Sequence, residues 1–162
     1  MKTDTLIFRE DVFPTDVGHV RDIVASTGFF FEAEIEVAVE LVQDRLTRGL
    51  ASEYYFVFAE QDGKVLGYTC FGPIACTLAS YDLYWIAVHH DARGKGIGKQ
   101  LLAQSEKCIA ARGGQRVYIE TASREQYEPT RKFYLSCGYR EEAILEDFYA
   151  PGDGKVIYVK AL

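Results

Sequence analysis

A run of mostly apolar residues leads directly into a glycine-rich basic loop and then into an amphipathic run, which constrains the fold more than any other feature. The run 81–88, YDLYWIAV, carries no charge after Asp82, as expected of a strand covered on both faces. The loop DARGKGIG, residues 91–98, follows closely, and apolar residues then recur at helical spacing from Ile97 to Ile109. A strand, a loop and a helix in this order predict an α/β domain.

The other segments complete a mixed order of strands and helices. Asp62-Gly63 between two β-rich runs indicates a hairpin. Pro14 with Asp16 indicates a helix start, and Gly28 the end of that helix. Strands are predicted at 5–10, 54–60, 64–72, 81–88, 116–121, 139–150 and 155–162, and helices at 14–28, 29–49, 97–112 and 129–137. The order β-α-α-β-β-β-α-β-α-β-β predicts an α/β fold (an α+β mixed sheet).

Length and charge limit the classes of protein that fit. A chain of 162 residues suits one domain over 1–162, because its halves would be too small to fold well. The net charge of −6 and the pI near 5.1 argue against a nucleic-acid partner. No apolar run reaches the roughly 18 residues that a membrane helix needs. The acidic start MKTDTLIFRED is unlike a secretory signal, and a cytoplasmic location is expected.

The cysteines and histidines suggest no metal site. None of the four cysteines, Cys70, Cys76, Cys108 and Cys137, forms a CxxC pair, and a metal site needs tighter clusters of ligands. We therefore expect free, mostly buried cysteines in a reducing compartment and no metal.

The loop has the composition of a phosphate cradle, since glycines let the chain turn tightly and expose backbone N–H groups at a helix start. A Walker loop is excluded, because Arg93 stands where its first glycine belongs and Gln100 where its hydroxyl belongs. A dinucleotide fingerprint begins with Gly94 and Gly96 but fails at Lys99. What remains is R-x-x-G-x-G between a strand and an amphipathic helix.

This pattern resembles the GCN5-related N-acetyltransferase (GNAT) family. YWIAVHHDARGKGIGKQLL is similar to the acetyl-CoA loop of that family, and RKFYLSCGYR to its short helix ending F-Y-x-x-x-G-[FY]. The order of elements matches over nearly the whole chain. The resemblance implies acetyl transfer from acetyl-CoA to a primary amine by direct attack, in a GNAT-like fold.

The resemblance also implies which residues bind the cosubstrate. Backbone N–H groups of the loop would bind the pyrophosphate, and the end of the preceding strand would pair with the pantetheine arm. Many members carry an asparagine seven residues before the family tyrosine; here that position is Tyr127, and either its hydroxyl or Ser123 would replace the contact. The implied cosubstrate residues are Ile86, Ala87, Val88, Arg93, Gly94, Lys95, Gly96, Ile97, Gly98, Lys99, Ser123 and Tyr127.

Tyr134 matches the family tyrosine near the thioester sulfur, where a phenol can protonate the leaving thiolate. The attacking amine must also lose a proton. Asp82 and Glu120 are the two candidates for the base, of which Asp82 is preferred. The alternative for each is a structural carboxylate.

The two N-terminal helices and the last two strands would select the amine. Aromatic residues beside carboxylates suit an ammonium on an apolar group, and the pocket candidates are Phe30, Phe31, Glu32, Asp147 and Tyr149. The alternative is that these residues pack in the core or begin a helix. A small amine, an amino acid and a peptide N-terminus all remain open.

Other functions and partners stay open. A non-catalytic acyl-CoA-binding sensor would keep the loop without needing Tyr134, and a related enzyme would transfer a longer acyl group. The apolar side of 155–162 could pair with another subunit, which leaves a homodimer open.

Overall fold

The structure, a computed structural model, describes residues 5–162; the first four residues of the acidic start and of the predicted domain 1–162 lie outside the described part. The chain forms two compact units. The first consists of the residues up to Gly72 together with Trp85–Cys108, and the second of Pro73–Tyr84 together with Ile109–Leu162. Strand β4 (Ser80–Val88) and helix α3 (Ile97–Ala111) contribute residues to both units.

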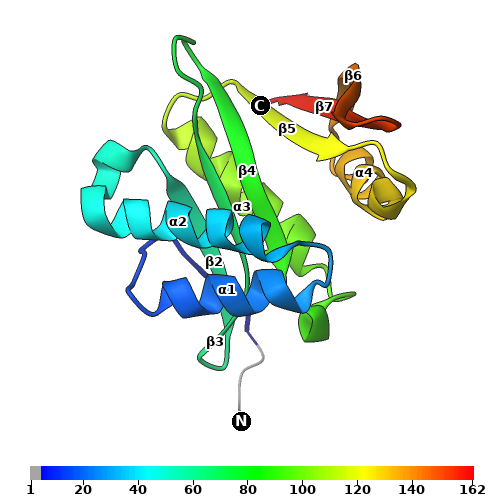
Figure 1. Ribbon diagram of the computed structural model, residues 1–162. Helices are drawn as coiled ribbons and strands as arrows, with labels where there is room; N and C mark the ends of the chain where they lie inside the picture. Colours follow the sequence, from blue (N-terminus) through cyan, green and yellow to red (C-terminus); the bar gives the residue numbers. More distant parts are fainter. Residues whose placement is uncertain (1–4) are drawn as a thin grey trace. The chain divides into compact units, whose positions relative to one another are not determined.

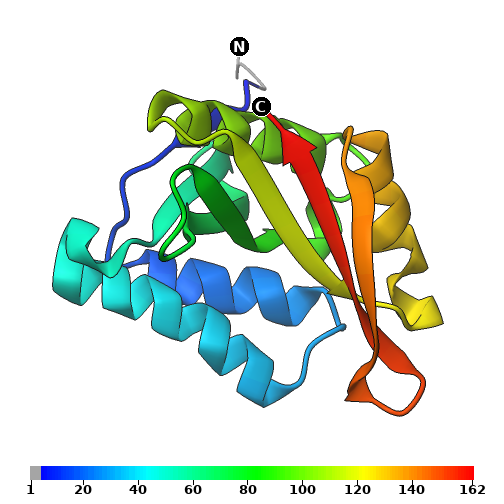
Figure 2. The same ribbon diagram turned by 90° about the horizontal axis from the view of Figure 1, so that it is seen from above.

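The first unit has helices on both faces of its strands. β1 (Ile7–Arg9) pairs antiparallel with β2 (Tyr55–Gln61), which pairs antiparallel with β3 (Lys64–Pro73). Helices α1 (Asp16–Ser26) and α2 (Glu32–Arg48) lie side by side over one face, and α3 lies on the other (Figures 1 and 2). Short 3₁₀ helices, η1 (Gly49–Ser52) and η2 (His90–Ala92), follow α2 and β4.

The core of the first unit follows from the spacing of its apolar residues. On each of the two N-terminal helices, apolar side chains recur three and four residues apart and face the strands. On β3, Tyr68 and Cys70 point into this core, whereas Thr69 between them bonds Ser105 of α3 at 2.6 Å between hydroxyl oxygens. The buried cluster comprises Val20, Ile23, Val24, Ile35, Ala38, Val39, Val42, Phe56, Phe58, Tyr68, Cys70 and Ala87.

The second unit is a mixed sheet with one helix of its own. Ser80–Leu83 of β4 pairs in parallel with β5 (Arg116–Ala122), and β7 (Asp153–Ala161) lies antiparallel between β5 and β6 (Arg140–Ala150). Figure 2 shows β6 at the edge. Helix α4 (Glu128–Ser136) follows the 3₁₀ helix η3 (Glu125–Tyr127). The hydrogen-bonded strand order through β4 is β1-β2-β3-β4-β5-β7-β6.

The predicted order of elements and the mixed α/β class are confirmed. The hairpin at Asp62-Gly63 joins β2 and β3 as predicted. β1 is shorter than predicted, with three residues in place of six. The spacing of apolar residues in the sequence is sufficient to predict the order of helices and strands, because helices and strands have different periods.

Two expectations are corrected. Only Cys70 is buried, whereas Cys76 is exposed and Cys108 and Cys137 are intermediate. β4 is not fully covered, because the Tyr84 side chain is 41% exposed.

Helix α1 begins at Asp16 as predicted, and the Asp16 carboxylate also forms a buried ion pair with Arg9. Both carboxylate oxygens of this fully buried residue accept hydrogen bonds from Arg9 of β1 at 2.8 Å, and Oδ2 also accepts the N–H of Phe13 at 2.7 Å. Burial alone would raise the pKa of Asp16, but the bonds from Arg9, Phe13 and His19 hold it below its ordinary value. Asp16 therefore ties α1 to β1.

No helix within residues 5–162 is long and apolar enough to span a bilayer.

Candidate active site

The glycine loop of the first unit presents an uncovered cationic surface at the start of α3. Residues from Arg93 to Gly96 are exposed, and Ile97 is buried as the first residue of the helix. Gly94 and Gly96 have φ of 77° and 76°, a backbone conformation that residues with a Cβ rarely adopt. The first turn of α3 contains no acidic residue, so the partial positive charge of its N-terminus is not neutralised there. This arrangement fits a phosphate group.

Two contacts tie this loop to the end of α1. The Ser26 hydroxyl donates to the Ile23 carbonyl at 2.6 Å and accepts the backbone N–H of His90 at 3.0 Å. The Arg93 guanidinium lies 5.6 Å from the ring centre of Phe29, a cation–π distance. The segment after α1 and the loop before α3 are therefore fixed to each other within the first unit.

The end of β4 and the start of α3 hold the other residues of this unit that are predicted to bind the cosubstrate. Ala87 is buried in the core cluster, and Ile86 and Val88 are half-buried beside it in sequence. Lys95 and Lys99 are exposed, and Gly98 is intermediate.

The predicted acceptor residues Phe30, Phe31 and Glu32 lie in different surroundings. Phe30 packs edge-on against Trp85, with ring centres 5.1 Å apart, whereas Phe31 is 74% exposed. Glu32 forms an ion pair with Arg21 at 3.0 Å. A core role thus suits Phe30 alone, and Phe31 is available to a ligand.

In the second unit, the two candidate bases lie on one face of the sheet. Asp82 is in register with Tyr118 of β5, and Glu120 stands two residues further along β5 on the same face. The Glu120 carboxylate is bound by the Lys155 ammonium at 2.9 Å. Within residues 5–162, no hydrogen bond or ion pair engages the Asp82 side chain. Burial, and then the nearby charge of Glu120, raise the pKa of Asp82 to about 6, while Lys155 acts to lower it.

Tyr134 lies on the opposite face of this sheet. Its ring contacts that of Tyr158 with centres 5.8 Å apart, and Tyr158 is in register with Ile119, the neighbour of Glu120 that points the other way. Tyr134 is 5% exposed, and burial, with smaller contributions from Cys137 and Tyr158, raises the pKa of its phenol well above 10. The phenol therefore keeps its proton throughout the physiological range.

The segment that carries Ser123 and Tyr127 is anchored to the start of β7. Ser123 exchanges two bonds with Gly154: its N–H donates to the carbonyl at 2.8 Å, and its hydroxyl accepts the Gly154 N–H at 2.7 Å. Arg124 pairs with the buried Asp153 at 3.2 Å and stacks over the Tyr127 ring at 5.2 Å. One of the two acceptor positions of the Ser123 hydroxyl is therefore used by the Gly154 N–H.

The last residues of β6 include the remaining predicted residues. Asp147, with φ of 54°, accepts the Gly152 N–H at 2.7 Å and so shapes the turn. Tyr149 is 49% exposed and packs edge-on against Phe148, with centres 5.0 Å apart. Burial, together with the charges of Glu120 and Asp153, raises the pKa of Tyr149, which Lys155 opposes. Tyr149 thus borders the face that carries Glu120 and Lys155.

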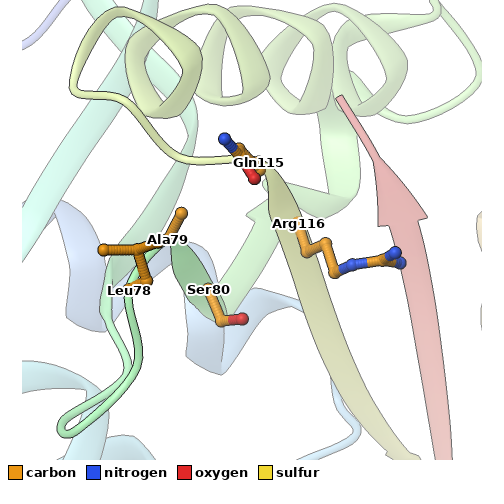
Figure 3. Close-up of a pocket in the computed structure, with 5 residues that line it drawn as sticks. All are labelled: Leu78, Ala79, Ser80, Gln115 and Arg116. Atoms are coloured by element: carbon orange, nitrogen blue, oxygen red, sulfur yellow. The ribbon is translucent and has the colours of Figure 1, made fainter.

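A small open pocket in the second unit contains none of the predicted site residues. It is lined by Leu78, Ala79, Ser80, Gln115 and Arg116 at the start of β4 and β5. Figure 3 shows the Arg116 guanidinium directed away from Leu78 and Ala79. Its polar groups do not converge, and we assign it no function. Within residues 5–162, no three His, Cys, Asp or Glu side chains gather closely enough to hold a metal ion.

Sequence reasoning missed the side chains that hold these groups in place. Ser26, Arg124 and Lys155 act through contacts with residues far along the chain. Lys155 begins the strand predicted at 155–162, but only the pairing of β5 with β7 brings it beside Glu120. No local pattern of the sequence carried that information.

The mixed sheet and the glycine loop at a helix start define an α/β protein of the acyltransferase type, and comparison with known proteins identifies the family. The sequence model of the acetyltransferase (GNAT) domain matches residues 52–141, which include parts of both units. The chain belongs to the GNAT family of acetyltransferases.

Individual relatives agree with this assignment. The chain is 43% identical, with a TM-score of 0.96, to a crystal structure from Desulfovibrio desulfuricans assigned to the GNAT acetyltransferases, covering 97% of this chain and 99% of that one. It is 31% identical over 110 residues to an uncharacterized N-acetyltransferase of Methanocaldococcus jannaschii, a match that spans 65% of each chain. An aminoglycoside 6'-N-acetyltransferase complexed with coenzyme A has a TM-score of 0.76 at 19% identity, covering 96% of each chain, and so shares the fold.

Proposed function

We propose that this protein transfers the acetyl group of acetyl-CoA to a primary amine carried by a small amine, an amino acid or a peptide N-terminus. The glycine loop at the start of α3 is the observation that carries this proposal. Membership of the GNAT family and the relative complexed with coenzyme A support it. We further propose that the two units act as one catalytic domain, since β4 runs through both and the family match includes residues of both.

The pyrophosphate would lie against the loop N–H groups from Arg93 to Gly98, with Lys95 and Lys99 adding charge. The pantetheine arm would pair with the main chain of Ile86, Ala87 and Val88. β4 pairs with β5 over Ser80–Leu83 and runs on to Val88, which supports an unpaired strand edge for this role. Ser123 and Tyr127 would contact the arm further along.

Asp82 is the better candidate for the base that takes the amine proton. Glu120 is already bound by Lys155, whereas the pKa of Asp82, raised to about 6, allows it to be ionised at neutral pH and to accept a proton.

Tyr134 would donate a hydrogen bond to the departing thiolate. Burial raises the pKa of this phenol, so the phenol carries its proton at neutral pH and would act as the general acid that protonates the leaving sulfur.

A thiol-release assay against amines, amino acids and short peptides tests the proposal. The wild type should release coenzyme A with one amine class, and Tyr134→Phe should lower kcat by about 10²-fold or more while leaving acetyl-CoA affinity nearly unchanged. Binding without release by the wild type would leave the non-catalytic sensor. Unchanged turnover in the variant would remove Tyr134 from the chemistry.

A further inference from the structure

Lys155 is the cation at the centre of the carboxylate face of the second unit. Its ammonium binds Glu120 at 2.9 Å and lies 3.9 Å from the ring centre of Phe148, while its side chain is only 14% exposed. Glu120 (48% exposed) and Phe148 (51% exposed) are both open to solvent. A half-buried cation held by a carboxylate and an aromatic face has two independent reasons to stay in place.

The register of β4, β5 and β7 places Asp82 on the same face of the sheet as the Lys155–Glu120 ion pair. Asp82 is opposite Tyr118, Glu120 follows two residues later, and Lys155 is opposite Ala122, two residues beyond Glu120. All three charged side chains therefore share one face. The other titratable groups of this unit near that face are Tyr118 of β5, Tyr149 of β6 and Tyr84 of β4 itself.

We propose that Lys155 is a positioning residue for the acetyl transfer: by binding Glu120 it withdraws that carboxylate from base chemistry and keeps Asp82 ionisable at neutral pH. This inference rests on the proposed function for its catalytic consequence, but its electrostatic part concerns the protein alone. Without Lys155, Asp82 and Glu120 would be two neighbouring carboxylates, and like charges disfavour the ionised form of each. With it, Glu120 is paired and Asp82 alone is left to accept the amine proton.

The test is a titration of the Asp82 carboxyl by carbon-13 NMR, with the signal assigned from its loss in Asp82→Asn. In the wild type the midpoint should lie near pH 6. Lys155→Met, which keeps an unbranched side chain over Phe148, should raise the midpoint by about one unit, and Lys155→Arg should restore it. Glu120→Gln should lower it. These two shifts of opposite sign cannot both come from a general loosening of the fold.

The same variants then have a kinetic signature. With the amine found in the thiol-release screen, the acid limb of kcat/KM against pH should move upward in Lys155→Met, in parallel with the NMR midpoint. An Asp82 midpoint that is unchanged in Lys155→Met, or that moves equally in Lys155→Arg, would overturn the role of Lys155 whatever the activity. Absence of thiol release by the wild type would overturn the proposed function instead, and the NMR result would be unaffected.

Discussion

At the scale of single residues, the most consequential contacts are charges that the fold removes from water. Asp16 is fully buried and depends on Arg9 and the Phe13 N–H to compensate its charge. An uncompensated buried charge is costly, so the loss of either partner should be felt throughout the first unit.

Asp16→Ala should lower the free energy of unfolding by about 1–3 kcal/mol, because it leaves the Phe13 N–H without its acceptor and removes one of the two carboxylates that bind Arg9, the other being Glu60. Urea denaturation measures this, and Glu36→Ala, which removes an exposed partner of Arg21, should leave the midpoint almost unchanged. The pH dependence of the stability follows from the lowered pKa of Asp16. The contribution of Asp16 to the free energy of unfolding is present above about pH 4 and is lost as the pH falls through the lowered pKa. Equal midpoints for the two variants would refute a structural role for Asp16.

At the scale of elements, the glycine loop is held by helix α1 as well as by its own glycines. The Ser26 hydroxyl satisfies the His90 N–H, and Phe29 covers the Arg93 guanidinium. These contacts connect the segment that carries the acceptor candidates to the loop proposed to bind the pyrophosphate.

Ser26→Ala should weaken acetyl-CoA binding several-fold, because the lost bond frees the 3₁₀ turn before the loop. Calorimetric titration gives the affinity, and thermal unfolding shows whether the fold is kept. Ser136→Ala, whose hydroxyl similarly bonds a carbonyl three residues earlier at the end of a helix, is the matched control. An affinity that falls equally in both variants would mean that the effect is general.

At the scale of the molecule, a protein of net charge −6 carries a local cationic loop at the site proposed for its anionic cosubstrate. Arg93, Lys95 and Lys99 are all exposed there, so local attraction competes with the overall charge.

The predictability of this molecule from its sequence also differs with scale. The order of elements and the glycine loop could be predicted, because apolar periodicity and glycine spacing are local properties. The pairing of Lys155 with Glu120 could not, since it depends on the register of β5 against β7, which no local pattern of the sequence specifies. The buried Arg9–Asp16 pair could not be predicted either, because each of the two residues looks ordinary in its local context.

The measurement that tests the central claim most directly is calorimetric titration of acetyl-CoA into the wild type, Gly96→Val and Gly63→Val. Both glycines have φ of 76°, so both substitutions carry a similar backbone strain, but Gly63 lies in the β2–β3 hairpin of the same unit. We expect one acetyl-CoA per chain in the wild type, little change in Gly63→Val, and at least about tenfold weaker binding in Gly96→Val. No binding by the wild type, or equal binding by Gly96→Val, would contradict the assignment of this loop as the acetyl-CoA site.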